Sequence, residues 1–468
     1  MSKRIYADVN PDENRVAIVE DEKLVDLHIR RFDDTKIAGN IYVGIIKNVI
    51  EGINSCFVDI GMGKNAFLPI SDYSGDIRKG ERILVQVVKE ELQEKGAKIT
   101  GKISLPGRHI VFIPTEKKIG VSRNIKDRDE RDRLKEILVS VSPNNGGFVA
   151  RTDAINQSKK DIIREAKYLL NIWKMISKRY KRVNKAKNPQ LIYKESSIVI
   201  YAAREFLDKN TEEFLINDKR IYSKVLLFVK KIFPEYKSKI KLYNSDTPIF
   251  EKYRLEEQIE NLKKRNISLK CGGYIIIEQT EALTAIDVNT GSFTTGTNRE
   301  NTAVKVNAEA ARAAASQIIM RDIGGIIVID FIDLENSSNR KKLLQILKDE
   351  MRVDKARLKI YPMSRLGLIE MTRQRRKESI ADILCQDCPY CSGSGMIFSE
   401  TTMYIKIKRE LMKKGKSIPG RVLNLFIHPR VAEIFDEKGV GNIQKEINKK
   451  INLRRDYKMH HEEFRISS

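Results

Sequence analysis

The sequence predicts a multidomain α/β (α+β) protein that contains a small β-barrel, and three observations support this prediction. The 468 residues suffice for two or more domains with hydrophobic cores. Short runs rich in β-branched residues follow one another closely between residues 39 and 114, separated by glycine-containing turns. Beyond residue 127, segments with apolar residues at helical spacing alternate with single strands, which is typical of α/β folds.

The first 37 residues alternate apolar and polar positions, which predicts a short antiparallel sheet that begins one domain. The closely spaced runs that follow predict a barrel of about five strands. Periodicity alone leaves a sandwich open as the alternative. The runs that carry this prediction are residues 41–46, 55–60, 66–70 and 82–88.

An α/β insertion comes next, with a strand at 147–151 between two predicted helices and a solvated turn at 181–187. Helices and strands then alternate as far as residue 361. The residues after 400 predict a small basic domain. The predicted helices are 128–141, 159–180, 301–321, 339–352, 403–414 and 443–452, and the predicted later strands are 239–243, 274–278, 282–288, 325–331 and 358–361.

The charge of the chain favours a polyanionic partner. Lysine and arginine number 87 against 63 acidic residues, and the formal charge of +24 is spread over the whole length. The N-terminus has no apolar segment typical of a secretory signal, so we expect a cytoplasmic protein. The longest apolar stretch, 323–334, is interrupted by two aspartates and is too short to span a membrane.

Polar side chains stand at the ends of two predicted strands. Asp287 and Asn289 are two positions apart, so their side chains project from the same face. Asp330 ends a strand that is otherwise apolar. Buried strands rarely end in unpaired carboxylates, because an ionised carboxylate without a partner is costly to bury. The pair therefore favours a magnesium ion, although pairing with arginines, or a turn cap for Asp287, is the structural alternative.

Three of the five cysteines are packed into residues 385–391, which indicates thiolate ligands in a reducing compartment. The Cys388-Pro-Tyr-Cys391 knuckle supplies two ligands, whereas a structural zinc ion takes four. Within one chain, Cys385 and a histidine are one route to a complete set. The candidate histidines are His428, His460 and His461, and Cys56 and Cys271 are interpreted as packing residues.

Together these motifs resemble the ribonuclease E and ribonuclease G family. The resemblance rests on Asp287-Val-Asn-Thr-Gly291 and Asp330-Phe-Ile-Asp-Leu334 and extends from residue 1 to about residue 400. The flanking segments 238–243, 281–286, 321–329, 364–375 and 388–395 are similar to the family as well.

The resemblance implies a magnesium-dependent endoribonuclease that cleaves single-stranded RNA, such as messenger RNA and ribosomal RNA precursors. It implies that Asp287 and Asp330 bind magnesium and that Asn289 orients the scissile phosphate or a ligating carboxylate. The products would carry a 5′-phosphate and a 3′-hydroxyl. A binding-only protein and a DNA nuclease or phosphodiesterase remain the competing interpretations of the residues themselves.

The resemblance also implies two RNA-binding regions. Phe57, Phe67 and Lys95 coincide with the RNA-binding positions of the family's barrel, where rings stack on bases and an amine meets phosphate; placement of both rings in the core is the alternative. A pocket for a 5′-monophosphate would be formed by Gly107, Val111, Arg151 and Thr152. An arginine fork and a hydroxyl suit a terminal phosphate.

The family's architecture implies an RNase H-like subdomain (1–37 and 197–264) with an inserted OB-fold barrel (38–101) and 5′-sensor region (102–196). A DNase I-like catalytic subdomain (265–384), a zinc link (385–399) and a small C-terminal domain (400–468) follow. Zinc would be shared between Cys388 and Cys391 of two subunits, which implies a homodimer or homotetramer. With no long disordered tail in the sequence, the chain resembles the shorter family members.

Overall fold

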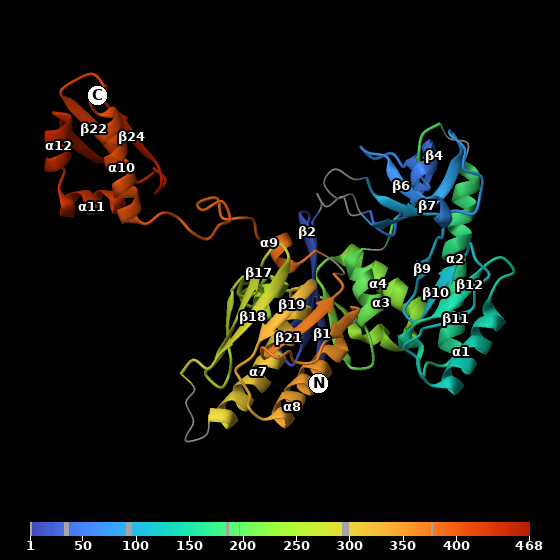
Figure 1. Cartoon of the computed structure of the whole chain (residues 1–468). Coiled ribbons are helices and arrows are strands. Elements are labelled where there is room, and N and C mark those ends of the chain that lie inside the picture. Colours follow the sequence, from blue (N-terminus) through green and yellow to red (C-terminus); the bar gives the residue numbers. More distant parts are fainter. Residues whose placement is uncertain are drawn as a thin grey trace. The chain divides into compact units, whose positions relative to one another are not determined.

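The computed structural model describes residues 2–31, 37–89, 96–183, 187–195, 197–292, 299–354, 356–375 and 378–468. The chain divides into two compact units, Met1–Ile383 and Leu384–Ser468 (Figure 1). Its mixed α/β architecture with a closed β-barrel agrees with the general fold class expected from the sequence, whereas the RNase H-like, DNase I-like and zinc-link assignments stay predictions. Among the described residues, no helix is both long enough and apolar enough to cross a membrane.

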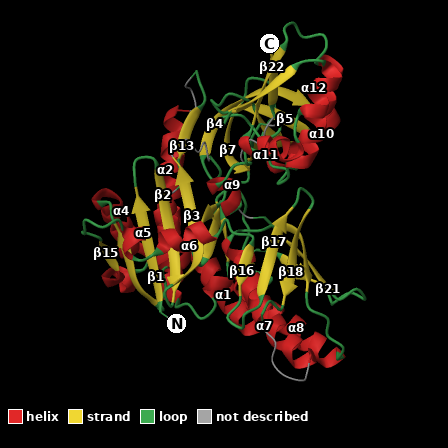
Figure 2. Ribbon diagram, turned by 90° about the vertical axis from the view of Figure 1, so that its left-hand side faces the viewer, coloured by secondary structure: helices red, strands yellow, loops and turns green. Residues whose placement is uncertain are grey.

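The three N-terminal strands form one side of a five-stranded sheet with the order β15-β14-β1-β2-β3, in which β1 is central and β3 is an edge strand. Alternate residues of β1 point into different cores, since Ile5 packs with α3 and α4 while Tyr6 packs with α6 on the other face. Figure 2 shows this sheet with α4 and α6 beside its strands. The bounds are β1 Lys3–Val9, β2 Glu13–Glu20, β3 Lys23–Arg31, β14 Thr211–Ile216, β15 Ile240–Leu242, α3 Ile198–Phe206, α4 Lys219–Ile232, α5 Ile249–Lys252 and α6 Leu255–Asn261.

The next strands close into a five-stranded barrel, so the barrel rather than the sandwich is correct. Their order is β4-β5-β6-β8-β7, and β4 also pairs with β7 to complete the circle. Only the β6–β8 pairing within this circle is parallel. The bounds are β4 Ile41–Ile50, β5 Ser55–Asp59, β6 Ala66–Pro69, β7 Arg82–Lys89 and β8 Lys98–Thr100, and β13 Gln190–Tyr193 adds to β4 from outside.

The α/β insertion consists of a four-stranded sheet with the order β11-β12-β10-β9 and two helices. Helix α1 begins as expected because the side chain of Asp127 accepts a hydrogen bond from the N–H of Asp129. Helix α2 runs to Val183, so the turn predicted from residue 181 was wrong for its first residues. The bounds are β9 Leu105–Pro106, β10 Ile110–Ile113, β11 Gly120–Val121, β12 Gly147–Ala150, α1 Arg128–Val141 and α2 Lys159–Val183.

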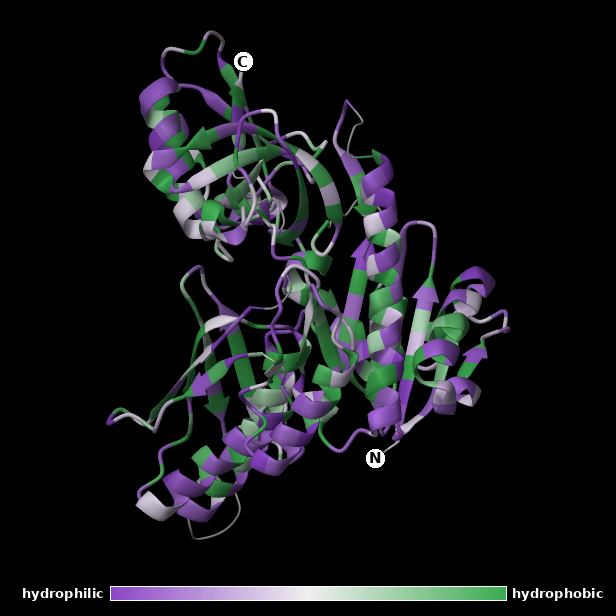
Figure 3. Ribbon diagram, turned by 90° about the vertical axis from the view of Figure 1, so that its right-hand side faces the viewer, coloured by the Kyte–Doolittle hydropathy of each residue, from purple (hydrophilic) through white to green (hydrophobic). Residues whose placement is uncertain are grey.

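The third large sheet has the order β16-β17-β18-β19-β21-β20, and α7 and α8 cover one of its faces (Figure 1). Strands β18 and β19 are parallel because α7 returns the chain to the same edge between them. Bands of hydrophobic and hydrophilic residues alternate along the helices in Figure 3. The bounds are β16 Asn266–Ser268, β17 Tyr274–Gln279, β18 Leu283–Asn289, α7 Arg299–Met320, β19 Gly325–Asp330, α8 Ser337–Glu350, β20 Leu358–Ile360, β21 Leu368–Arg373 and α9 Ile380–Leu384.

The second unit packs three helices on a three-stranded sheet with the order β23-β22-β24. The helix predicted to continue to residue 452 was wrong at its end. Asn448 adopts a left-handed conformation with φ 55°, which ends the helix at Ile447, and a strand follows. The bounds are α10 Glu400–Lys414, β22 Val422–Ile427, α11 Pro429–Lys438, α12 Gly441–Ile447, β23 Lys450–Arg455 and β24 Phe464–Ser467.

Candidate active site

Asp287 and Asp330 lie side by side at the ends of two parallel strands. They are direct partners in the register of β18 and β19, and neighbouring strands lie about 4.8 Å apart. Their chain neighbours Ile286 and Ile329 are buried in the core formed with α7 and α8. Both carboxylates are therefore exposed on the opposite face of the sheet, close enough to share one cation.

Asn289 lies on the same face, as its spacing predicts. Its Nδ2 donates a hydrogen bond of 2.8 Å to Oδ2 of Asp287, which orients that carboxylate. The strand then turns at Gly291, which has φ +56°. A Cβ at this position would lie 2.4 Å from the carbonyl oxygen of Gly272, so a larger residue would displace the end of the motif.

The electrostatics of this cluster favour a bound cation. Burial raises the pKa of the Asp330 carboxyl, and the negative charges of Asp287 and Asp333 raise it further. In the described part of the chain, no lysine or arginine forms an ion pair with any of these three carboxylates. The described residues therefore do not support the alternative in which arginines pair with these aspartates.

The same cluster leaves most of an ion's coordination sphere open. Among the described residues, no group of three or more His, Cys, Asp or Glu side chains is placed to hold a metal ion. Two carboxylates without further protein ligands fit magnesium, which keeps water molecules and takes substrate phosphate oxygens as ligands. They fit zinc poorly, because structural zinc sites use four protein ligands.

Two residues that the sequence analysis missed fix the loop after β19. Asn307 on α7 is fully buried, and its side chain bonds both the N–H (3.0 Å) and the carbonyl oxygen (2.7 Å) of Ile332. Glu300, at the start of α7, accepts hydrogen bonds from the N–H groups of Glu335 and Asn336. A polar residue inside the apolar stripe of a predicted helix is the signal that identifies Asn307.

The raised pKa of Asp330 leads to a pH-dependent prediction for the metal-free protein. Because the folded-state pKa lies above the unfolded value, the destabilisation by burial and by repulsion of the ionised carboxylate is fully present above the folded pKa and is absent below the ordinary value of 3.8. Asp330→Asn should therefore unfold at a higher temperature than the wild type near pH 7, and the gap should close as the pH falls. Melting curves of both proteins in a chelator at several pH values measure this difference in melting temperature. A difference that does not change with pH would contradict the prediction.

On the barrel, Phe57 and Phe67 form a partly exposed cross-strand pair and are not part of its core. They are register partners on β5 and β6, with ring centroids 6.1 Å apart in an edge-to-face arrangement. Both rings are half-buried, whereas the barrel interior is filled by other side chains. Their outer faces are available to stack on bases.

Lysines continue the row that these rings begin. Lys95 lies outside the described residues. Lys98 on β8 is the register partner of Phe67, and Lys89 on β7 is in turn the partner of Lys98. Both lysines are exposed. The barrel therefore presents two rings followed by two amines in one row, a pattern that the sequence analysis located only in part.

Of the residues expected to bind a 5′-phosphate, the structure brings Gly107 and Arg151 into direct contact. Nη1 of Arg151 donates a 2.6 Å hydrogen bond to the carbonyl oxygen of Gly107. Thr152 is exposed next to it, and Val111 is half-buried on β10. These four residues are called the sensor cluster below. Two residues that the sequence did not identify adjoin this cluster. The hydroxyl of Ser122 lies 3.2 Å from that of Thr152, and Glu205 accepts a hydrogen bond from Arg151.

In the second unit, Cys388 and Cys391 form a two-thiol knuckle. The N–H of Gly395 donates to Sγ of Cys391 over 3.3 Å and lowers the pKa of that thiol, as does the adjacent Cys388 side chain. Such N–H donors stabilise a thiolate ligand. Cys385 is exposed, while His460 and His461 contact Tyr390. Among the described residues, no third His, Cys, Asp or Glu side chain joins these two thiols in a group placed to hold a metal ion.

Comparisons with known proteins match this chain over nearly its whole length. A family model described as the Ribonuclease E/G family matches residues 104–376. Ribonuclease G of Salmonella typhimurium is 36% identical over 456 residues, which cover 92% of each chain. Ribonuclease G of Haemophilus influenzae is 35% identical over 487 residues, which cover 99% of this chain and 98% of the relative. Ribonuclease E of the same organism is 32% identical, with 96% of this chain matching 50% of that protein.

Proposed function

Because the chain belongs to the ribonuclease E/G family and is an endoribonuclease, we propose that it cleaves single-stranded RNA with a magnesium ion held by Asp287 and Asp330. The observation that carries this proposal is the pair of in-register carboxylates without a cationic partner among the described residues. A basic protein that only binds RNA has no need of such a pair, since uncompensated acids repel a polyanion.

The residues around the pair have separate roles in this proposal. Asp287 and Asp330 supply the two anionic ligands, and Asn289 fixes the orientation of Asp287. When bound there, magnesium would activate a water molecule and offset the charge that develops on the phosphodiester. Water adds to phosphorus and the bond from phosphorus to the 3′ oxygen breaks, so the products carry a 5′-phosphate and a 3′-hydroxyl.

The barrel row is proposed to hold the RNA strand. Phe57 and Phe67 would stack on successive bases, and Lys98 and Lys89 would neutralise phosphates beside them. Splayed bases are accessible only in single strands, which supports single-stranded RNA as the substrate. Messenger RNA and ribosomal RNA precursors are the proposed sources of such strands.

Cleavage of a labelled single-stranded RNA with and without magnesium tests the proposed function. We expect endonucleolytic products with magnesium and intact RNA in a chelator, because the carboxylates then lack their ion. A matched DNA strand is the control for the class of nuclease and should remain intact. Binding of RNA without cleavage at any magnesium concentration would leave only an RNA-binding function.

We propose further that the sensor cluster gives a preference for 5′-monophosphorylated RNA, because a charge-assisted arginine contact suits a terminal phosphate. Arg151→Gln should reduce the ratio of kcat/KM for 5′-monophosphate over 5′-hydroxyl RNA by at least about tenfold. Arg352→Gln, which changes an arginine that is 74% exposed on the surface, is the matched control. An unchanged ratio in Arg151→Gln would reject this assignment of the cluster.

The cysteine knuckle is proposed to supply half of a zinc site. Cys388 and Cys391 would be two of four tetrahedral ligands, and the same two residues of a second copy would be the others. The N–H donation to Cys391 supports thiolate character at this position. A homodimer or homotetramer is the proposed assembly.

A further inference from the structure

The guanidinium of Arg151 is already held on two of its edges. Its terminal edge pairs with Glu205, since Nη1 donates to Oε1 over 3.0 Å and Nη2 donates to Oε2 over 2.9 Å. The flank on the Nη1 side donates to the carbonyl oxygen of Gly107 over 2.6 Å. An arginine has five N–H donors, and those left over are on Nε and the outer side of Nη2.

The remaining edge of the Arg151 guanidinium, formed by Nε and Nη2, can donate two hydrogen bonds to one ligand. Nε–H and the outer Nη2–H point the same way, in the fork geometry that matches two oxygens of a phosphate. In the described part of the chain no hydrogen-bond partner occupies this edge, and the Arg151 side chain is 26% exposed. Two hydroxyls 3.2 Å apart adjoin Arg151: Thr152 is the next residue in the chain, and Ser122 directly follows the neighbouring strand β11.

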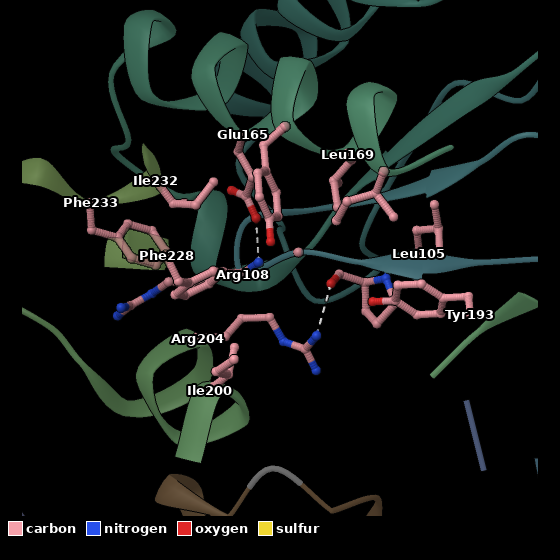
Figure 4. Close-up of a pocket in the computed structure, with 14 residues that line it drawn as sticks. Leu105, Arg108, Glu165, Leu169, Tyr193, Ile200, Arg204, Phe228, Ile232 and Phe233 are labelled. Atoms are coloured by element: carbon pink, nitrogen blue, oxygen red, sulfur yellow. Dashed lines mark hydrogen bonds between the residues drawn. The ribbon is translucent and has the colours of Figure 1, made fainter. Parts of the chain in front are cut away.

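Glu205 is itself rigidly placed. It lies on α3 with a side chain that is only 4% exposed. Nε of the adjacent Arg204 donates to its Oε1 over 3.2 Å. Arg204 also donates to the carbonyl oxygen of Pro106 over 3.1 Å, and Figure 4 shows this side chain among those that line the adjoining pocket. The carboxylate is therefore fixed relative to strand β9, just before the sensor cluster begins.

The carbonyl oxygen on the other edge is fixed too. Gly107 donates its N–H to the carbonyl oxygen of Ile110 over 2.8 Å. A Cβ at this glycine would lie 2.0 Å from Oε1 of the buried Glu165, so only glycine lets that carboxylate approach the turn. Arg151 is thus held between two acceptors that cannot move away from it.

A buried acid next to a phosphate-binding arginine can act in two opposite ways. As a charge, Glu205 weakens the attraction of Arg151 for a phosphate, and its removal would then strengthen binding. As a support, it orients the fork before the ligand arrives, and its removal would then weaken binding. The two-bond, end-on geometry with the second edge left open favours the support.

We propose that Glu205 is a positioning residue of the sensor cluster, which holds Arg151 so that its Nε–Nη2 edge receives one terminal phosphate of the RNA. This inference rests on the proposed role of the sensor cluster. The terminal phosphate would bind one edge of Arg151, and Glu205, which orients that edge, lies on α3 and not in the sheet of β9–β12.

The test measures the ratio of kcat/KM for 5′-monophosphate over 5′-hydroxyl RNA, with each variant's own rate on 5′-hydroxyl RNA as its internal standard. Glu205→Gln should lower the ratio at least about fivefold, through a higher KM on monophosphorylated RNA, because an amide accepts only one of the two arginine bonds. Glu205→Asp keeps the carboxylate and should lie between Glu205→Gln and the wild type. Glu212→Gln, the same change at a side chain that is 50% exposed, is the control.

The outcomes separate this inference from the proposed function. An unchanged or increased ratio in Glu205→Gln, together with a lost preference in Arg151→Gln, overturns the role of Glu205 alone. A wild type without preference, or Arg151→Gln that keeps it, overturns the sensor cluster itself. If Glu205→Gln fails to fold, Glu205→Asp decides, and a ratio equal to that of the wild type overturns the proposal.

Discussion

Asp287→Asn and Asp330→Asn are each expected to reduce RNA cleavage by at least about 10³-fold, because a metal ion contributes several kcal/mol to charge stabilisation in the transition state. Each substitution removes one of the two anionic ligands and leaves a side chain of nearly the same shape. RNA binding by the barrel row should persist, since Phe57 and Phe67 lie on a different sheet. Rates under single-turnover conditions and binding of a labelled RNA measure the two effects.

Asp349→Asn, at a side chain that is 46% exposed on α8, is the matched control and should cleave like the wild type. The metal-free Asp330→Asn protein should be at least as stable as the wild type, because a like charge has been removed. Loss of cleavage with retained folding and binding is thus the expected combination. A variant that retains a near-wild-type rate would remove its residue from the mechanism.

Arg373→Ala is expected to destabilise the first unit by about 3–5 kcal/mol, the usual cost of breaking a buried ion network. Arg373 on β21 donates to Asp322 over 2.7 Å and to Asp354 over 2.6 Å. All three side chains are only 3% exposed. The substitution removes the guanidinium that these two buried carboxylates share, at the end of β19 opposite Asp330. Urea unfolding of the wild type and the variant measures the loss.

Arg312→Ala is the matched control for this prediction. Arg312 pairs with Glu350 over 3.5 Å on the surface, where it is 55% exposed. Exposed pairs contribute about 0–1 kcal/mol, so its loss should be small. Equal effects of the two substitutions would show that Asp322 and Asp354 find other compensation and that the network does not hold the sheet together.

The parts of the fold that sequence analysis predicted are those with local signals. Helix α1 was predicted with its observed bounds, because its apolar spacing and the Asp127 cap lie within one short segment. The proximity of Asp287 and Asp330 was predictable since parallel strands end at the same edge of a sheet. The placement of Phe57 and Phe67 outside the barrel core needed the resemblance, because periodicity on these strands does not separate the inner from the outer face.

The parts that it missed depend on contacts between distant segments. Strand β14 pairs with β1 across some 200 residues, and nothing in either strand specifies the other. Glu205 and Arg373 are buried charges whose partners lie elsewhere in the chain, so neither is distinguishable from a surface residue in the sequence. The end of α12 at Asn448 was missed because asparagine only sometimes adopts the left-handed conformation.

Direct counting of bound divalent ions tests the central claim, with manganese in place of magnesium and electron paramagnetic resonance as the readout. The wild-type protein should bind one manganese ion more per chain than either Asp287→Asn or Asp330→Asn, at equal folded fractions. Identical numbers and affinities in all three proteins would contradict the claim that these two carboxylates hold the ion.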